Sequence, residues 1–253
     1  MKFPKLTKSK AVLIAIGLVF SFFGLPDPSF ALDTKDKSEV ETIIREYLLK
    51  NPEIFIEVQQ ALEAKQKLET ATAQKRTLAD KHDLIYNSKH QMEIGNPDAP
   101  ITIVEFFDYN CGFCQRALAD MNRFVKEDKN VRFILKEFPV LGEASVQAHR
   151  VSLAFSTLMP DKVEQFHTEL LGKRGRKNGK VAAELALSLG VGDAELAAEM
   201  EKPYIVAAMR EVYELADGLA ITGTPSYIIG NDVIFGAVGY AQLKARIDKI
   251  GTN

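Results

Sequence analysis

The sequence has only two cysteines, and both lie in one short motif, Cys111-Gly-Phe-Cys114. A disulfide between residues this close in sequence closes too small a loop to stabilise a fold, which argues against a purely structural bridge. A zinc site needs about four ligands, and there is no second Cys-x-x-Cys motif. The histidines, at positions 82, 90, 149 and 167, show no helical or zinc-finger spacing. Redox chemistry is therefore the best interpretation of the pair.

Methionine is also scarce, and the charge of the chain is nearly balanced. The 6 methionines form no cluster, which weighs against a copper-binding or copper-buffering protein. That alternative stays open, because two thiols are soft ligands that suit copper. A formal net charge of −2 gives no indication of a nucleic-acid partner.

The N-terminus lacks an apolar run long enough for a comfortable membrane span. Four lysines precede an apolar run at positions 11–20, and one glycine and two prolines interrupt the residues that follow. Ser29 and Ala31 supply small residues at the two positions that a signal peptidase reads. We therefore predict a signal peptide at residues 1–31, cleaved after Ala31, and export to the periplasm. An uncleaved anchor is the alternative.

Residues 32–88 are predicted to form a helical segment and linker. Apolar residues from Val40 to Leu48 recur at i, i+3, i+4, i+7 and i+8, which is one face of an amphipathic helix. Asn51 and Pro52 predict a break, with Asn51 as the N-cap of a second helix and Pro52 at its first position. A weak heptad pattern follows. Two helices cannot bury their own apolar face, so we expect self-association into a dimer or trimer. Packing on the rest of the same chain is the alternative.

Residues 89–253 combine strand and helix patterns and predict an α/β domain. Two apolar strands flank a helix that begins at the cysteine motif, which indicates a right-handed βαβ unit. A long helical insertion, a hairpin and a last helix follow. The expected elements are strands at 101–107 and 131–138 with a helix at 112–125 between them, helices within about 143–219, strands at 226–229 and 233–235, and a helix at about 239–250.

The position of the motif assigns a role to each cysteine. Cys111 would stand at a helix N-terminus, where unpaired N–H groups lower the pKa of a thiol and favour the nucleophilic thiolate. Cys114, one turn later, would resolve the mixed disulfide. Glu105 lies within the apolar strand before the motif, where burial would raise its pKa and let it exchange a proton with Cys114. The alternative is a structural ion pair between Glu105 and Lys136 on the next strand.

These features together resemble a known family. The run from Glu105 to Cys114, the helical insertion and Gly223-Thr224-Pro225 ahead of a hairpin are similar to the DsbA-like branch of the thioredoxin superfamily. With the N-terminal helices, the chain most resembles the ScsC-like (suppressor of copper sensitivity) periplasmic disulfide isomerases. The resemblance implies an α/β thioredoxin fold with an inserted helical domain and an N-terminal helical oligomerisation extension.

The resemblance also implies further site residues. Thr224-Pro225 would form a cis peptide bond facing the cysteines, with the Thr224 backbone pairing with bound polypeptide like an added strand. Gly112 and Phe113, between the cysteines, would contact substrate and tune the pair. Strongly oxidising relatives carry a histidine in place of Phe113, so we expect a milder oxidant here.

The expected function is thiol:disulfide interchange, with isomerisation or reduction of misfolded, cysteine-containing periplasmic proteins. This activity requires a reduced pair, which implies a DsbD-like membrane reductase as a partner. We expect no dissociable cofactor and no metal. A DsbA-like dithiol oxidase that introduces disulfides is the main alternative. The basic loop at 173–180 is interpreted as a solvated surface.

Overall fold

The computed structural model describes residues 33–250, in two units, Met1–Gln59 and Gln60–Asn253. The predicted signal peptide lies outside the described residues. None of the described helices is both long enough and apolar enough to cross a membrane.

The break between the first two helices differs from the prediction. α1 (Thr34–Lys50) ends at Asn51, whose side-chain Nδ2 donates a 2.8 Å hydrogen bond to the carbonyl of Tyr47. α2 (Glu53–Asp80) begins two residues later, with Pro52 in the turn. The prediction that Asn51 caps α2 and that Pro52 is its first residue is therefore wrong. The Asn51 side chain satisfies a carbonyl of the helix before it instead.

The apolar face of the first unit is exposed in the single chain. α1 has no buried residue. The side chains of Ile43, Ile44, Tyr47, Phe55 and Ile56 are each more than half exposed. Exposed apolar side chains this close together are typical of an interaction surface.

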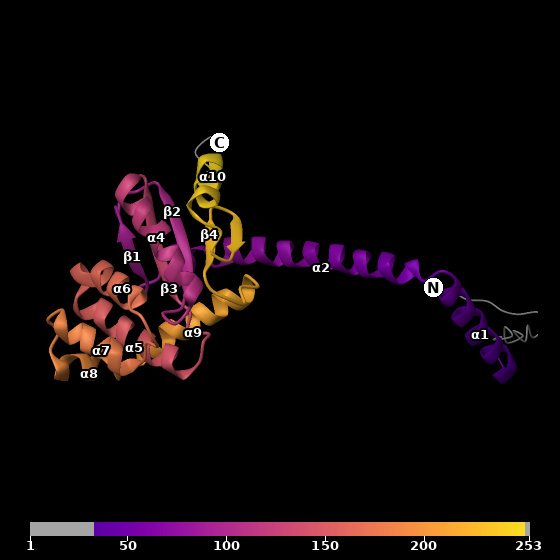
Figure 1. Cartoon of the computed structure of the whole chain (residues 1–253), viewed down its shortest axis with the longest axis horizontal. Coiled ribbons are helices and arrows are strands. Elements are labelled where there is room, and N and C mark those ends of the chain that lie inside the picture. The colour runs from indigo at the N-terminus through magenta and orange to yellow at the C-terminus, as the bar shows by residue number, and fades with distance from the viewer. Residues whose placement is uncertain (1–32, 251–253) are drawn as a thin grey trace, which may run out of the picture. The chain divides into compact units, whose positions relative to one another are not determined.

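The second unit is built on a five-stranded mixed sheet (Figure 1). Its order is β1-β3-β2-β4-β5, with β2 and β3 parallel and the other neighbours antiparallel. The parallel pair and the helix between them form the predicted βαβ unit. The strands are β1 (Met92–Gly95), β2 (Ile101–Phe107), β3 (Val131–Glu137), β4 (Ser226–Ile229) and β5 (Asp232–Phe235).

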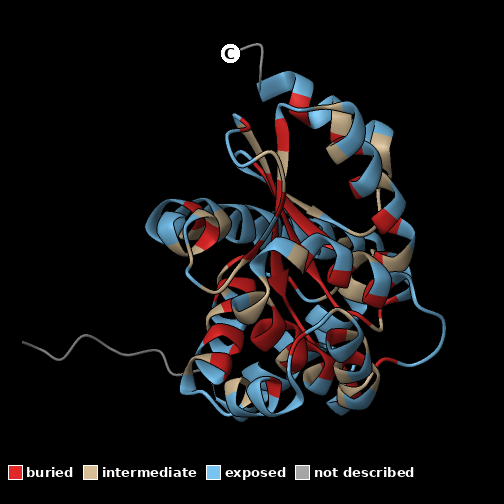
Figure 2. Cartoon of the chain, turned by 90° about the vertical axis from the view of Figure 1, so that its left-hand side faces the viewer, coloured by how far each residue is buried: buried red, intermediate tan, exposed pale blue. Residues whose placement is uncertain are grey.

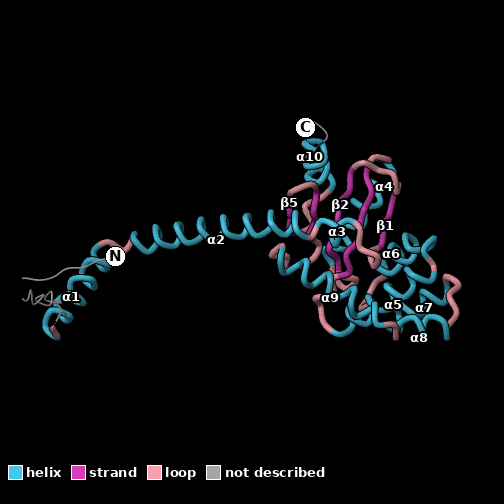
Figure 3. Tube along the Cα trace, turned by 180° about the vertical axis from the view of Figure 1, so that it is seen from behind, coloured by secondary structure: helices cyan, strands magenta, loops and turns pink. Residues whose placement is uncertain are grey.

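Helices cover both faces of the sheet. α4 (Gly112–Glu127) and α10 (Tyr240–Ile250) share one hydrophobic core with the sheet and with the first half of α9 (Pro203–Gly218). α3 (His82–Tyr86) and the second half of α9 share a second core. Seen from behind, α3 and α9 lie on the face away from α4 (Figure 3). The strands between them are mostly buried (Figure 2).

Alternate residues of β2 point into the two cores. Ile103 and Phe107 belong to the core that contains α4, whereas Val104 and Phe106 belong to the core that contains α3. Side chains alternate between faces along a strand, so Glu105 lies on the face of Ile103 and Phe107. The carboxyl group is thereby placed on the side of the cysteine helix.

The predicted helical insertion is confirmed as a set of short helices after β3. Its helix α6 contacts both α4 and the edge strand β1. Its last helix, α9, returns to the sheet. The other helices of the insertion are α5 (Glu143–Leu158), the 3₁₀ turn η1 (Pro160–Lys162), α6 (Val163–Gly172), α7 (Gly179–Ser188) and α8 (Asp193–Met200).

Two elements of the second unit, β1 and α3, were not predicted from the sequence. The predicted boundary at residue 88 is also later than the boundary between the units, at Gln59. The end of α2 belongs to the second unit, because Leu78 lies in the core with α9 and Thr77 Oγ1 donates to the Gly218 carbonyl at 2.8 Å. Short elements with few apolar residues give weak periodic signals, and tertiary contacts stabilise them.

Candidate active site

Cys111 lies at the junction between β2 and α4. Its backbone is extended (φ −77°, ψ 115°) and it is the N-cap residue of α4, so the first N–H groups of the helix point toward its sulfur. Cys111 is 6% exposed and Cys114 is fully buried, one turn further along. Both are free thiols in the structure.

The surroundings of Cys111 favour its thiolate. A hydrogen bond from the Cys114 thiol, with further ones from the Thr224 side chain and the N–H groups of Phe113 and Cys114, lowers the pKa of Cys111 to about 5. Its sulfur also lies 3.2 Å from the Thr224 carbonyl oxygen. A pKa of about 5 means that the thiolate prevails at neutral pH. Cys111 is therefore equipped as the nucleophile.

Cys114 has the opposite character. Its hydrogen bond to Cys111, its burial and the nearby Glu105 raise the pKa of Cys114 well above its ordinary value. Cys114 therefore remains a protonated thiol until it loses its proton to a base. A resolving cysteine of this kind needs such a base close by.

Glu105 is placed to be that base. It is buried, and desolvation, followed by the charges of Cys111 and Asp120, raises the pKa of Glu105 to about 8. A carboxyl group that titrates near neutral pH can both accept and return a proton. The charge of Glu105 contributes to the raised pKa of Cys114, which indicates that the two groups lie near each other.

The alternative ion pair between Glu105 and Lys136 is not formed. Glu105 lies opposite Leu135 in the parallel register, and Lys136 lies opposite Phe106, so the two side chains point to opposite faces of the sheet. Lys136 Nζ instead donates to the Leu84 carbonyl at 2.6 Å and to Gln91 Oε1 at 2.8 Å. Burial lowers the pKa of Lys136 to about 8.

The predicted substrate-contacting residues surround the nucleophile. The Thr224–Pro225 peptide bond is cis, as the resemblance implied. Phe113 is 56% exposed, and the Arg116 guanidinium lies 4.3 Å from its ring centroid. Gly112 is exposed, and a Cβ there would meet nothing within 4 Å. The side of the motif bearing Gly112 and Phe113 is thus open to a polypeptide.

Buried polar groups that we did not predict hold the turn before Cys111. Asp108 is fully buried and accepts four hydrogen bonds. Its Oδ1 accepts from the Asn110 N–H at 2.8 Å and from the Ser145 hydroxyl at 2.7 Å. Its Oδ2 accepts from the N–H groups of Val140 and Leu141 at 2.8 and 2.9 Å. Asp108 therefore joins the cysteine turn to the loop after β3 and to α5.

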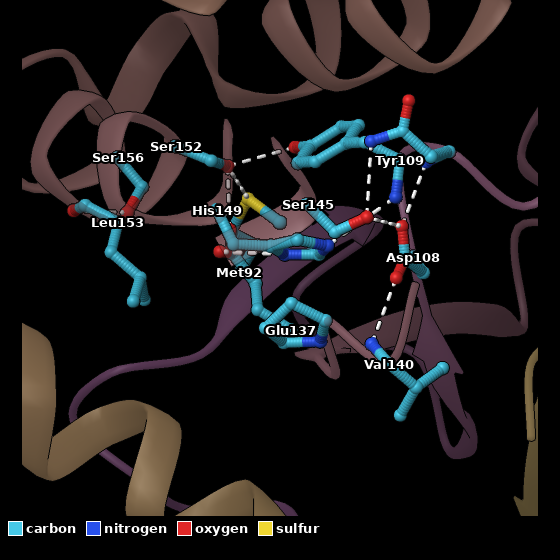
Figure 4. A network of polar contacts seen from close by, with 12 residues as sticks. Met92, Asp108, Tyr109, Glu137, Val140, Ser145, His149, Ser152, Leu153 and Ser156 are labelled. Carbon is cyan, nitrogen blue, oxygen red and sulfur yellow. Dashed lines mark hydrogen bonds and ion pairs between the residues drawn. The ribbon is translucent and has the colours of Figure 1, made fainter. Parts of the chain in front are cut away.

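A second group of buried side chains continues this network (Figure 4). The Tyr109 N–H donates to His149 Nε2 at 3.3 Å, so the ring proton is on Nδ1, which lies 3.1 Å from a Glu137 carboxylate oxygen. The Ser152 hydroxyl donates to Glu137 at 2.5 Å and accepts from the Tyr109 hydroxyl at 2.8 Å. We define Asp108, Tyr109, Glu137, His149 and Ser152 as the supporting network.

Of this network, the sequence indicates only Asp108. Asp108 directly follows an apolar strand and precedes the cysteines, a position where a carboxylate needs partners. Its partners come from positions up to 37 residues away, so the sequence did not identify them. Among residues 33–250, no cluster of three or more histidine, cysteine or acidic side chains could hold a metal.

Comparison with known proteins agrees with this geometry. Residues 102–248 match the DSBA-like thioredoxin domain family, and residues 36–69 match the N-terminal domain of the copper resistance protein ScsC. The chain belongs to the DsbA-like thioredoxin family. It also resembles disulfide bond formation protein D of Bacillus subtilis (strain 168), with 25% identity over 64% of this chain and 77% of that protein.

Solved structures extend the similarity to both parts of the chain. A thioredoxin-like oxidoreductase from Silicibacter pomeroyi DSS-3 is 35% identical over 68% of this chain and 98% of its own, with a TM-score of 0.64. The catalytic domain of Proteus mirabilis ScsC is 26% identical over 71% and 99%, with a TM-score of 0.64. Proteus mirabilis ScsC in a transitional conformation is 29% identical over 87% and 96%, with a TM-score of 0.62. The protein is a thiol-disulfide oxidoreductase with a DsbA-like fold.

Proposed function

We propose that this oxidoreductase is an exported disulfide isomerase and reductase that acts on misfolded, cysteine-containing proteins. One combination of features carries the proposal. The dithiol site has Phe113, and no histidine, beside its nucleophile, and the N-terminal helices expose an apolar face. Several sites held around one substrate can repeat exchanges until native disulfides form.

The reaction starts with the Cys111 thiolate. It attacks one sulfur of a substrate disulfide, forms a mixed disulfide and releases the other substrate sulfur as a thiolate. In isomerisation, a second substrate thiolate attacks the mixed disulfide and regenerates Cys111. In reduction, Glu105 takes the proton of Cys114, the Cys114 thiolate displaces the substrate, and the protein is left with a Cys111–Cys114 disulfide and the substrate with two thiols.

Substrate binding would involve the residues around the nucleophile. The backbone of Thr224, beside Pro225, would pair with an extended segment of substrate, and Phe113 with Gly112 would contact its side chains. The redox-active cysteine pair supplies the chemistry, so no dissociable cofactor takes part. A DsbD-like membrane reductase would return the electrons lost in each reduction.

The N-terminal helices would associate between copies of the chain, as a dimer or a trimer. The groove between α1 and the start of α2 is lined by Glu41 and Arg45 and by five further residues, Ile44, Leu48, Leu49, Pro52 and Phe55. The last five side chains are apolar and belong to the first unit alone. Burial of such a face would stabilise an assembly by about 1.5–3 kcal/mol per fully buried large side chain.

The proposed place of action is the periplasm. The lysine-rich start, the apolar run and the small residues at Ser29 and Ala31 support a signal peptide cleaved after Ala31. One structural relative, a thioredoxin-like protein from Salmonella enterica serovar Typhimurium with 27% identity, is described as periplasmic.

The decisive experiment separates self-association from thiol chemistry in the full mature chain. The double variant Ile44→Glu/Phe55→Glu should lower the solution mass to that of a monomer and abolish refolding of a scrambled disulfide substrate, while reactivity with a small disulfide persists. The control, Ser38→Glu/Gln60→Glu, changes two exposed polar positions of the same helices and should alter neither property.

The DsbA-like oxidase predicts a different outcome. A mature protein that is already a monomer, rests as the disulfide in the cell and oxidises reduced substrates would replace the isomerase proposal with the oxidase. All assays are run with a metal chelator, because loss of activity under chelation would instead indicate a required metal such as copper.

A further inference from the structure

One strongly charged segment remains unused by the chemistry above. Residues 173–180 comprise the connection between α6 and α7 and the first two residues of α7, and they contain five cationic residues and no acidic one; we call them the basic loop. It comes more than fifty residues after the cysteines in the sequence. In the structure it lies against the cysteine turn and the start of α4.

Three hydrogen bonds hold this basic loop in place, and a fourth holds the end of α6 just before it. The Lys177 N–H donates to Asn110 Oδ1 at 2.7 Å, and Asn110 Nδ2 donates to the Lys177 carbonyl at 2.8 Å. Gln115 Nε2 donates to the carbonyls of Leu171 and Lys173 at 2.9 and 3.0 Å. Asn110 directly precedes Cys111, and the Gln115 N–H is bonded to the Cys111 carbonyl. Both ends of the loop are therefore anchored next to the nucleophile.

Four of the five charges of this loop face solvent, whereas the Lys177 side chain is buried near Asp108. Lys173, Arg174 and Arg176 are exposed, and so is Arg116 on the first turns of α4. We define these four residues as the cationic rim. Among residues 33–250, no carboxylate forms an ion pair with any of them.

Some other cations of the same unit form ion pairs with carboxylates. Arg132 pairs with Glu93 at 2.8 Å, and Arg246 pairs with Asp232 at 2.8 Å. Lys180, at the far end of the basic loop, has Glu184 at 4.0 Å. Among the described residues, Lys81 and Lys126 also form no ion pair, but the cationic rim places four unpaired cations beside Cys111, where they add to the field of the α4 N-terminus.

We propose that the cationic rim selects disulfides flanked by acidic polypeptide segments. This inference rests on the proposed exchange reaction at Cys111 and names the substrate class of that site. Fixed positive charges beside a reactive group raise the local concentration of anionic partners and the rate of encounter, and salt screens both effects. The Phe113 ring beneath Arg116 provides an apolar contact at the same place.

The test compares three peptides that share one intramolecular disulfide and differ only in the residues beside it, glutamate, glutamine or lysine. Reduced mature protein is mixed with each peptide, and the second-order rate constant is followed at low and high salt. In the measured reaction two electrons pass from the Cys111–Cys114 dithiol to the peptide, which ends as a dithiol while the protein ends as a disulfide. We expect the glutamate peptide to react about tenfold faster than the lysine peptide at low salt, with the difference shrinking in high salt.

The variant Arg174→Glu/Arg176→Glu should reverse this preference. The control variant Lys81→Glu/Lys126→Glu carries the same change of charge at two exposed positions, one before β1 and one at the far end of α4, and should keep it. A preference that the control variant also loses would show an effect of net charge alone and would overturn the inference.

A neutral disulfide, 2-hydroxyethyl disulfide, separates the two proposals. If it reacts normally with every variant while the three peptides react equally fast, the cationic rim has no role in selection and exchange at Cys111 stands. If it does not react with the unmodified protein, the proposed function itself fails. Far-ultraviolet circular dichroism confirms that the variants are folded.

Discussion

Two clusters of buried polar groups meet at the turn that carries Cys111, and they are built in opposite ways. In the supporting network each carboxylate accepts several hydrogen bonds, as Asp108 does from four donors. In the reactive cluster of Glu105, Cys111 and Cys114, the pKa of every group is displaced from its ordinary value.

The difference separates stability from reactivity. A buried carboxylate with all its partners is stable as an ion and holds the backbone around it. Glu105, whose buried carboxyl group has no hydrogen-bond partner among residues 33–250, is destabilised as an ion and exchanges its proton near neutral pH. Substitutions in the two clusters should therefore change stability in opposite directions.

The largest effect is expected for Glu137→Leu in the supporting network. Removing the carboxylate leaves the His149 Nδ1–H and the Ser152 hydroxyl buried without their acceptor, so the free energy of unfolding should fall by about 3–5 kcal/mol. Chemical denaturation measures the loss. Glu93→Ala, which breaks a partly exposed ion pair with Arg132, is the control and should cost less than about 1 kcal/mol. Equal losses for both variants would remove the distinction between the clusters.

A smaller effect of opposite sign is expected for Glu105→Gln. The pKa of Glu105 is raised from 4.5 to about 8, so its contribution to stability is present below pH 4.5 and is lost as the pH rises to about 8. Glutamine does not ionise, so the variant should gain about 3 kcal/mol relative to the parent at pH 7, at about 1.4 kcal/mol for each pH unit above 4.5. Exchange that requires Cys114 should become slower at neutral pH, by about a hundredfold if Glu105 is the base.

Denaturation at several pH values and single-turnover reduction of a peptide disulfide measure the two parts of this prediction. Glu214→Gln, an exposed position on α9, is the matched control and should leave both unchanged. An unchanged rate with a changed pH dependence of stability would leave Glu105 a structural role only.

The smallest effect is expected for Phe113→His, between the two cysteines of the reactive cluster. An imidazole beside Cys111 can donate to the thiolate and stabilise the reduced form, so the reduction potential should rise by about 30 mV, which is about 1.4 kcal/mol. Equilibration with glutathione buffers measures the shift. Phe113→Leu keeps the position apolar and should not move the potential, and a rise in both variants would point to loss of the Arg116 contact instead.

The sequence predicted those parts of the fold that repeat a local pattern. β2 begins and ends at the expected residues, because a run of apolar and β-branched side chains is typical of a central strand. The helix from Gly112 and the hairpin near residue 230 follow from similar local signals. Asn51 was assigned to the wrong helix, because the same side chain can cap the end of one helix or the start of the next.

The residues of the site also fall into two groups, those predicted from local signals and those that depend on long-range contacts. Cys111, Cys114 and Glu105 were found because their residue types and spacing are local, and Thr224-Pro225 because a family resemblance supplied the match. The partners of Asp108 and Glu137, and the position of the basic loop against Asn110, depend on contacts between segments far apart in the chain. The hydrophobic periodicity of the sequence contains no information about such contacts.

The sequence by itself determined the chemistry of this protein, since one Cys-x-x-Cys pair at a strand-to-helix junction suits thiol exchange and little else. The tertiary structure decided how that chemistry is controlled. It placed Glu105 on the face of the cysteines and Lys136 on the other, completed the supporting network, and brought the basic loop beside the nucleophile. The physical reason is that pKa values, burial and local fields depend on distances in space, which a linear order of residues does not contain.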